Sequence, residues 1–356
     1  MSRQSPSVID CDGHLMESIH ELAEYMPPDI RRVALAPTRN RQGVFPSLDG
    51  FHYPPGTATE GAKQRKRVTA SEHPSGSGLD WLAFLNKAEI EHSVLFPTEG
   101  LSIGFLQLEQ YTVELCRAYN NYLAERFRQV SDRLHPMGLI PMLSASEAVV
   151  ELRRAVKELD LPGAMLPATG LPLHLGHEYY WPVYEEAQRL GCVLGVHGGS
   201  NRGLGIDSFT DFTASHVLHH PVSLMIAAVS LICHGVLDRY PELRVAFLEG
   251  GCAWTVCLLD RMHRDEGYFP GKAKRQLPEY LTSGQILIGC EGDDESLAYL
   301  GQRVGIEPFA YSSDYPHEVD LLDAQRQIAE TRERADLTAE QKAAVLGGNA
   351  RPFFRL

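Results

Sequence analysis

The sequence has little of what nucleic-acid-binding and membrane-bound proteins need. Its 33 Lys and Arg residues are outnumbered by 46 Asp and Glu residues, which leaves a formal net charge of −13. Because binding to nucleic acid and to anionic membrane surfaces depends on basic side chains, we expect neither as a partner. The most apolar run, residues 222–237, includes polar residues and is shorter than the roughly 20 residues that cross a bilayer.

Other absences narrow the class of protein further. The seven cysteines include no C-x-x-C pair, and most lie in apolar stretches, which favours buried, reduced thiols. Residues 1–7 lack the charged and then apolar pattern of a secretory signal, so we expect a cytoplasmic protein. No Gly-x-Gly-x-x-Gly follows the first predicted strand, which argues against a doubly wound dinucleotide-binding sheet.

Short apolar segments alternate with amphipathic ones along the whole chain. The segments predict eight strands, at residues 7–11, 92–97, 134–140, 163–166, 192–197, 244–249, 285–289 and 309–312. Helical patterns occur at residues 79–91, 113–130, 146–159, 180–190, 222–239 and 254–264. Eight strands with helical crossovers predict an α/β protein, a single (β/α)₈ TIM-like barrel over residues 1–356. Residues 25–78 keep neither period, and we expect an irregular insertion there that covers the barrel mouth as a lid.

Carboxylate and imidazole side chains follow five of the eight predicted strands. Active sites of such barrels lie at the C-terminal ends of the strands. Asp12 and His14 are two residues apart and would project to the same side of an extended chain, while His197 and Asp314 follow the fifth and eighth strands. Mixed nitrogen and oxygen donors suit Zn²⁺, Mn²⁺ or Fe²⁺. The sequence therefore predicts one divalent metal ion at the mouth, most simply zinc, held by these four residues.

Further side chains near the strand ends are candidates for proton transfer and substrate binding. Glu249 ends the sixth strand and has three alternatives: a general base, a ligand that holds a second metal ion, or an acceptor that orients a ligand histidine. His216 and His220 follow the fifth strand and would share one face if their segment were helical. We expect His216 to contact substrate and His220 to take part in catalysis. Arg202, on the same loop, is a candidate partner for a substrate carboxylate.

Several motifs together resemble one known family. They are Asp-x-Asp-x-His at residues 10–14, Val-His at 196–197, and the stretches at 235–245, 313–317 and 346–351. With these motifs the chain resembles, over nearly its whole length, the amidohydrolase-related family (amidohydrolase 2) of aminocarboxymuconate-semialdehyde decarboxylase and the resorcylate-type decarboxylases. The resemblance implies a metal bound by Asp12, His14, His197 and Asp314, a substrate contact or supporting role for His317, and a homodimer. Asp314 is also a candidate catalytic residue.

One residue departs from the family pattern. Decarboxylases of the group often end the sixth strand in His-Gly-Gly, with the histidine assigned as the base, whereas this chain has Glu249-Gly250-Gly251. The resemblance implies a metal-dependent hydrolase or a non-oxidative decarboxylase that acts on a small carboxylated substrate, either aromatic or not. Because Glu249 adds a carboxylate, a dinuclear Fe or Mn/Fe oxygenase on the same barrel is the first alternative. A non-catalytic partner subunit is the second.

Overall fold

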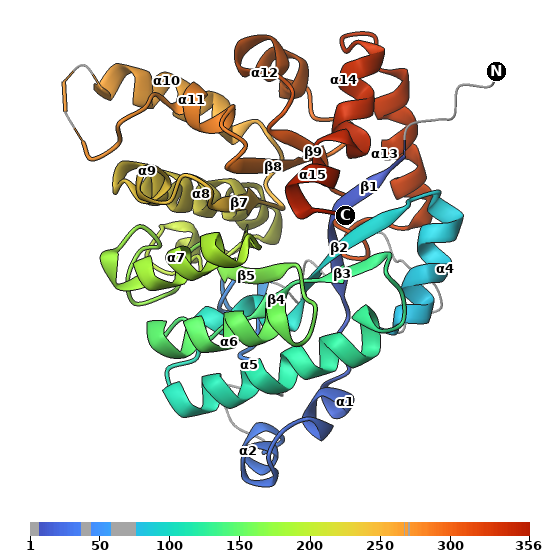
Figure 1. Ribbon diagram of the computed structural model, residues 1–356, viewed down its shortest axis with the longest axis vertical. Coiled ribbons are helices and arrows are strands. Elements are labelled where there is room, and N and C mark those ends of the chain that lie inside the picture. Colours follow the sequence, from blue (N-terminus) through green and yellow to red (C-terminus); the bar gives the residue numbers. More distant parts are fainter. Residues whose placement is uncertain (1–6, 37–43, 58–75, 267, 270) are drawn as a thin grey trace.

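The computed structural model describes residues 7–36, 44–57, 76–266, 268–269 and 271–356 (Figure 1). All strand pairings between its named strands are parallel. Two runs of neighbouring strands, β1-β2-β3 and β4 to β9, form the wall of the barrel. The strands are β1 (Ile9–Leu15), β2 (His92–Pro97), β3 (Leu134–Pro136), β4 (Gly138–Leu139), β5 (Gly163–Pro167), β6 (Val193–His197), β7 (Arg244–Phe247), β8 (Ile286–Cys290) and β9 (Phe309–Tyr311).

The ring closes between the first strand and the segment after the last. The Asp314 amide donates to the carbonyl of Asp12 at 2.8 Å, and the His14 amide donates to that of Tyr315 at 2.7 Å. The short strands β3 and β4 form one barrel strand that is interrupted at Met137, whose amide still donates to Leu95 of β2. Eight strands in a closed parallel ring confirm the predicted (β/α)₈ barrel.

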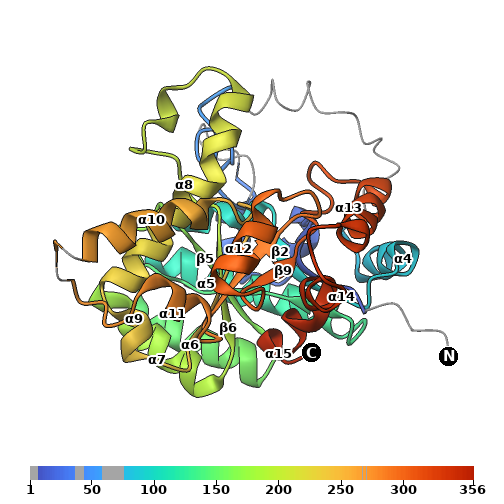
Figure 2. The same cartoon turned by 90° about the horizontal axis from the view of Figure 1, so that it is seen from above.

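Helices surround the strands, as Figures 1 and 2 show. Most expected helices are present within a few residues of their predicted ends, and helices near both ends of the chain were not predicted. The helices are α1 (Ile19–Glu24), α2 (Pro28–Ala34), α4 (Gly78–Ala88), α5 (Glu109–Leu123), α6 (Ala145–Lys157), α7 (Trp181–Leu190), α8 (Phe212–Cys233), α9 (Val236–Arg239), α10 (Trp254–Glu266), α11 (Leu277–Leu281), α12 (Ser296–Val304), α13 (Leu321–Glu333), α14 (Ala339–Ala343) and α15 (Ala350–Phe354).

The start of α8 corrects the sequence analysis. The helix begins ten residues before the predicted start at residue 222 and contains Pro221 in its interior. Asp211 caps it by accepting a hydrogen bond from the amide of Ala214 at 2.9 Å, which gives the first turn the partner it needs. By length and composition this helix alone, in the described part of the chain, could cross a membrane, and 50% of its apolar window is buried inside the protein. Burial of that extent is typical of a core helix.

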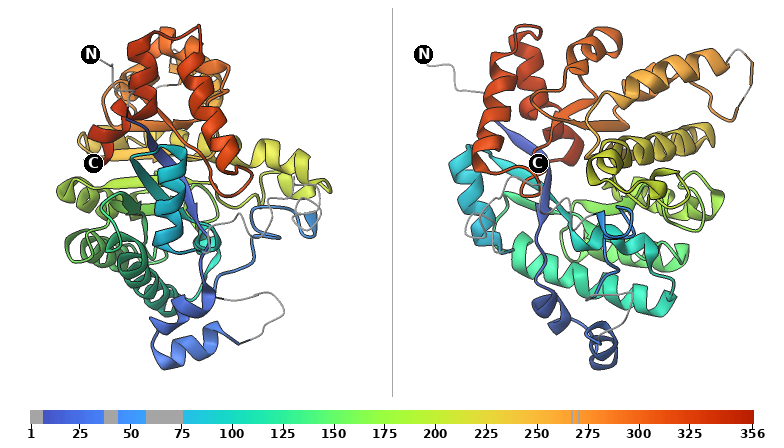
Figure 3. Two further views of the ribbon diagram at one scale, coloured as in Figure 1. Left: turned by 90° about the vertical axis from the view of Figure 1, so that its right-hand side faces the viewer. Right: turned by 180° about the vertical axis from the view of Figure 1, so that it is seen from behind.

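The predicted insertion at residues 25–78 lies partly outside the described residues, since 37–43 and 58–75 are not described. Within the described part, α2 is helical, which the sequence analysis did not predict. Pro28 stands at its first position and Asp29 in its first turn, and both favour a helix start. Residues 44–57 run beside the N-terminal half of α8, and Figures 2 and 3 show this from different sides.

A buried side-chain amide replaces strand pairing at the break between β3 and β4. Asn120 of α5 donates from Nδ2 to the carbonyl of Leu139 at 2.9 Å, and its Oδ1 accepts from the amide of Leu139 at 2.8 Å. Its Nδ2 also donates to Glu151 of α6 at 2.6 Å. The Asn120 amide therefore pairs with the backbone of β4 and links that strand to two helices.

Replacing Asn120 by alanine is expected to lower the free energy of unfolding by about 3 kcal/mol, because the amide and carbonyl of Leu139 lose buried partners. The matched control is Asn121→Ala, because Asn121 is the next residue on α5 and bonds the guanidinium of Arg154 at 2.8 Å. We expect that variant to lose less than about 1 kcal/mol. Chemical denaturation of both variants measures the difference, and equal losses would contradict the role given to Asn120.

Candidate metal centre and active site

Four side chains at the C-terminal ends of the strands bring nitrogen and oxygen donors together. Asp12 and His14 lie within β1, His197 ends β6, and Asp314 follows β9. Asp12 Oδ1 lies 3.5 Å from His14 Nε2 and 3.2 Å from His197 Nε2. His14 Nε2 lies 3.4 Å from Asp314 Oδ1. The structure thus brings together the four residues that the sequence predicted as ligands.

The first strand is longer than predicted, because it continues past residue 11 to Leu15. Aspartate and glycine are rare in strands, which is why the sequence pattern ended it early. In the structure the register shifts between Asp10 and Gly13, as at a β-bulge. Gly13 is required there, because a Cβ atom would lie 2.5 Å from the ring of Trp81. The strand therefore carries both metal-ligand candidates, Asp12 and His14, within its last four residues.

Asp12, His14 and His197 offer donor atoms that all lie within 4.8 Å of one another, and Asp314 joins them through its 3.4 Å contact with His14. Bonds of about 2.0–2.1 Å from Zn²⁺ to nitrogen or oxygen place tetrahedral donors about 3.3 Å apart. Among the described residues, Nε2 of His14 and Oδ2 of Asp12 are buried without a hydrogen-bond partner. An unpaired buried polar atom costs about 1–3 kcal/mol. A divalent cation among the four side chains would give both atoms a partner, so the residues present fit the predicted metal.

Neighbouring groups hold the ligands in the orientation that a metal requires. His14 Nδ1 lies 2.9 Å from the carbonyl of Pro97 and donates to it, which leaves Nε2 free as an acceptor. Asp10 is fully buried and accepts from the amide of Asp12 and from both the amide and the hydroxyl of Ser313. Ser93 of β2 donates to the same carboxylate at 2.9 Å. Asp10 therefore fixes the backbone on both sides of the ligand set.

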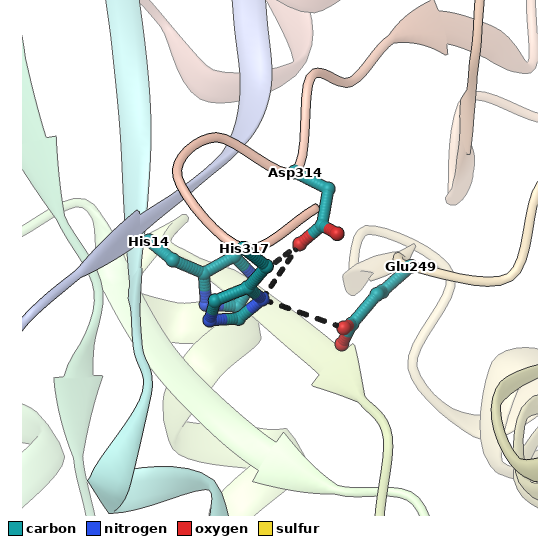
Figure 4. Close-up of side chains that lie close together, drawn as sticks. All are labelled: His14, Glu249, Asp314 and His317. Carbon is teal, nitrogen blue, oxygen red and sulfur yellow. Dashed lines mark hydrogen bonds and ion pairs between the residues drawn. The ribbon is translucent and has the colours of Figure 1, made fainter. Parts of the chain in front are cut away.

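Glu249 faces three imidazoles, and Figure 4 shows it beside His317 and Asp314. Its Oε2 lies 2.9 Å from His197 Nδ1 and 3.3 Å from His220 Nδ1, and its Oε1 lies 3.7 Å from His317 Nδ1. His317 Nδ1 also lies 2.8 Å from Asp314 Oδ1. The Glu249 carboxylate thus adjoins both the predicted metal ligands and the His317–Asp314 pair.

The charges in this cluster oppose the effect of burial. Burial would raise the pKa of Glu249, but the imidazoles of His220 and His197 outweigh it and hold that pKa well below its ordinary value. Burial would lower the pKa of His197, yet Glu249 and Asp12 raise it to about 10. Burial raises the pKa of Asp314 well above its usual range, although His317 opposes the rise. Glu249 is therefore ionised, and a metal bound at His197 would displace a proton from that ring.

Both carboxylates that follow late strands adopt an unusual backbone conformation. Glu249 has φ = +61° and Asp314 has φ = +56°, in the left-handed region that non-glycine residues seldom adopt. Aspartate tolerates this region better than glutamate does. Such conformations cost about 1–3 kcal/mol and persist where surrounding structure imposes them. The strain at Glu249 indicates that the barrel aims this side chain at the cluster.

The structure adds Thr98 and His52, which the sequence analysis missed. Thr98, just after β2, places Oγ1 2.9 Å from Nε2 of His317, so both ring nitrogens of His317 have partners. Glu17 accepts from the amide of Thr98 at 3.1 Å and from the hydroxyl of Tyr119 at 2.9 Å, which anchors that loop. His52, from the described part of the insertion, is buried beside α8. Its sequence position, far from any strand end, offered no signal.

The remaining predicted contacts differ in their placement. His216 and His220 do share a face of α8, with ring centres 5.4 Å apart, as the conditional prediction required. His220 is buried beside Glu249, whereas His216 is only half-buried. Arg202 is exposed and its guanidinium lies 4.5 Å from the ring centre of Phe105. The substrate contacts predicted for Arg202 and His216 stay predictions.

The sequence pattern of the amidohydrolase family matches residues 9–356. The chain belongs to the amidohydrolase family. This membership confirms the resemblance and the prediction of an enzyme of this kind. The 2-amino-3-carboxymuconate-6-semialdehyde decarboxylase of Dictyostelium discoideum is 26% identical over 277 residues, which cover 76% of this chain and 75% of that protein. The gamma-resorcylate decarboxylase of Polaromonas sp. is 24% identical over 269 residues, which cover 68% and 77%.

A solved structure shows the same fold. It is the 5-carboxyvanillate decarboxylase of Novosphingobium aromaticivorans, complexed with manganese and 4-hydroxy-3-methoxy-5-nitrobenzoic acid. Its TM-score is 0.71 with 19% identity, and the alignment covers 100% of this chain and 98% of that one. The two chains therefore share their fold over nearly their whole lengths.

Proposed function

We propose that this amidohydrolase-family protein is a metal-dependent, non-oxidative decarboxylase of a small aromatic carboxylate. The observation that carries the proposal is the four-donor set next to the His317–Asp314 pair, which places a proton-holding group beside a cation site. The names of the compared relatives favour decarboxylation over hydrolysis. They favour neither the oxygenase nor the non-catalytic partner subunit.

The proposed cofactor is one divalent ion held by Asp12, His14, His197 and Asp314. Zinc suits these donors, and the manganese in the related decarboxylase makes Mn²⁺ the alternative. When bound, the cation attracts the substrate carboxylate and an adjacent oxygen and holds the ring in place. Glu249, His14, Asp314 and His317 also offer donor atoms within 4.8 Å of one another. A second ion through Glu249 is therefore the alternative that metal stoichiometry tests.

The chain supplies the proton that decarboxylation consumes. His317 Nδ1 and Asp314 Oδ1 share a proton across 2.8 Å, and Thr98 holds the other ring nitrogen. We place this pair as the donor to the ring carbon that bears the carboxylate. The bond between that carbon and the carboxylate then breaks, its electron pair stays on the ring, and CO₂ leaves. The reaction consumes one proton and needs no oxidant.

Glu249 serves this reaction as an anion. Of the three alternatives that the sequence left open, its 2.9 Å contact with His197 Nδ1 favours the acceptor that orients a ligand histidine. The same carboxylate lies near His317 and stabilises a positive charge on that ring. His220 also contacts this carboxylate, with its Nδ1 atom 3.3 Å from Glu249 Oε2.

The direct test incubates metal-loaded protein with 2,6-dihydroxybenzoate and 5-carboxyvanillate in D₂O. We expect release of one CO₂ per acid consumed and one deuterium on the ring carbon that carried the carboxylate, seen by NMR. Protein stripped of metal by a chelator is the control and should be inactive until metal is restored. Hydrolysis of amides or esters instead, or consumption of O₂ with an added ring oxygen, would contradict the proposal.

We further propose that the enzyme acts in the cytoplasm as a homodimer. The buried position of most of the cysteines supports the cytoplasm. The family resemblance supports the homodimer. Light scattering of the purified protein measures the oligomeric state.

A further inference from the structure

The described segment at residues 44–57 is fastened to the barrel mouth by buried contacts. Asn201, on the loop after β6, donates from Nδ2 to the carbonyl of His52 at 2.7 Å, and its amide donates to that of Phe51 at 3.1 Å. The ring of Phe51 is buried and lies 3.9 Å, edge to face, from that of Phe105. Two hydrogen bonds from Asn201 therefore hold the backbone at Phe51 and His52.

Two more hydrogen bonds anchor the start of the segment. Ser102, in the turn after β2, donates to the carbonyl of Pro46 at 2.8 Å. Tyr111 of α5 donates to the carbonyl of Val44 at 2.8 Å. With anchors from the loops after β2 and β6 and from α5, the segment is a fixed part of the mouth. It presents His52 to the site in one position, as recognition of a substrate group requires.

His52 forms a buried pair with His219 of α8. Nδ1 of His52 lies 2.5 Å from Nε2 of His219, and the ring centres are 4.6 Å apart. His52 is 2% exposed and His219 is fully buried. The ring of His220 stacks 6.5 Å from that of His52 and connects the pair to Glu249. The pair thus adjoins the metal-donor cluster on its α8 side.

The outer nitrogens of this pair lack partners. Among the described residues, Nε2 of His52, Nδ1 of His219 and both ring nitrogens of His220 are buried without a hydrogen bond. In a neutral imidazole one nitrogen donates and the other accepts. Whichever ring donates across the shared contact, one outer nitrogen of the His52–His219 pair is then a donor and the other an acceptor. A group that both donates and accepts pairs with either arrangement.

The charge around the pair excludes an anion. Burial lowers the pKa of His52 to about 3, and that of His219 lies well below its ordinary value for the same reason, so both rings are neutral near pH 7. The charged and titratable groups that act on His52 are His220, Glu249, His197 and His317. Glu249 is the anion among them and would repel a second carboxylate. A hydroxyl group is neutral, donates and accepts.

We propose that His52 and His219 form a subsite that binds an uncharged hydroxyl group on the ring of the substrate, so that the segment at residues 44–57 sets substrate selectivity. The inference rests on the proposed function and assigns residues of this chain to a hydroxyl group of its substrate. The substrate carboxylate lies at the metal donors, and the hydroxyl lies at the imidazole pair.

The experiment compares 2,6-dihydroxybenzoate with 2-hydroxybenzoate, which lacks the second hydroxyl. Binding of each acid to metal-loaded protein is titrated, and kcat/KM is measured where turnover occurs. We expect the wild-type protein to favour the dihydroxy acid, and His52→Ala to reduce that preference about tenfold while leaving 2-hydroxybenzoate nearly unchanged. His52→Gln keeps an amide that donates and accepts, and should retain part of the preference. His20→Ala, at an exposed histidine of α1, is the matched control.

The outcomes separate this inference from the proposed function. The subsite proposal is wrong if His52→Ala weakens binding of both acids equally or of neither. It is also wrong if the wild-type protein binds neither acid. If the wild-type protein binds both acids without releasing CO₂, the decarboxylase proposal is wrong, and the binding ratio alone still decides the subsite. Retained selectivity in His52→Gln shows that the loss in His52→Ala comes from the missing hydrogen bond and not from misfolding.

Discussion

Protein in which Asp314 is replaced by asparagine is expected to purify with less than one-tenth of the wild-type metal content and to lose decarboxylase activity. Asp314 Oδ1 lies 3.4 Å from the free Nε2 of His14 and 2.8 Å from Nδ1 of His317, so one carboxylate serves both the cation and the proton-holding pair. Loss of an outer partner of a metal ligand costs about 10–100-fold. Loss of a ligand that also holds the proton should lower kcat/KM by more than about 10³-fold.

Asparagine suits the test because it tolerates the left-handed backbone, with φ = +56°, better than alanine does. Metal content is measured by mass spectrometry on protein purified without chelator. Asp293→Asn, at an exposed aspartate after β8, is the matched control and should keep full metal and activity. Full metal occupancy in the Asp314 variant would overturn the assignment of this residue as a ligand.

Replacement of Glu249 by glutamine is expected to lower kcat by about 10²–10⁴-fold, the range for loss of a group that controls proton transfer. The substitution keeps the size of the side chain but removes the anion that faces His197, His220 and His317. Burial then acts on these imidazoles with one counter-charge fewer, which disfavours their charged forms, although Asp12 still faces His197 and Asp314 still faces His317. The substitution therefore lowers the pKa of His317, because one of the two anions that stabilise its charged form is removed.

Metal content separates the roles that the sequence left open for Glu249. If the carboxylate orients His197 and stabilises charge, the Glu249→Gln variant keeps one metal ion per chain and loses mainly kcat. If Glu249 holds a second ion, stoichiometry falls from two to one. Glu249→Asp retains the charge on a shorter side chain and should recover part of kcat. Glu295→Gln, at an exposed glutamate just before α12, is the control.

Glu249 stands where the family resemblance implies a histidine, and this difference changes the charge of the site. A histidine there would add a fourth imidazole to three that already face one another. Glu249 instead supplies a negative charge, which raises the pKa of His197 to about 10 and draws a proton toward His317. In the proposed reaction, the proton donor therefore lies in the segment after β9 and not at the end of β7.

The sequence alone predicted the barrel and the set of side chains that meet at its mouth. The alternation of apolar and amphipathic segments is local, and in a parallel barrel every strand delivers its C-terminal residue to the same mouth. Asp12, His14, His197 and Asp314 could therefore be placed together without knowledge of any contact. Boundaries were less well predicted where local preference conflicts with packing, as at the bulge in β1 and at Pro221 within α8.

Only the tertiary structure decided the roles of side chains away from the strand ends. His52 lies in a segment with no period, and its place beside His219 depends on Asn201, a residue 149 positions away along the chain. Thr98 and Asn120 likewise act through partners that chain folding brings near. The pKa of Glu249 depends on imidazoles from three different elements. Position along a strand is encoded locally, whereas electrostatic environment and hydrogen-bond partners are properties of the assembled fold.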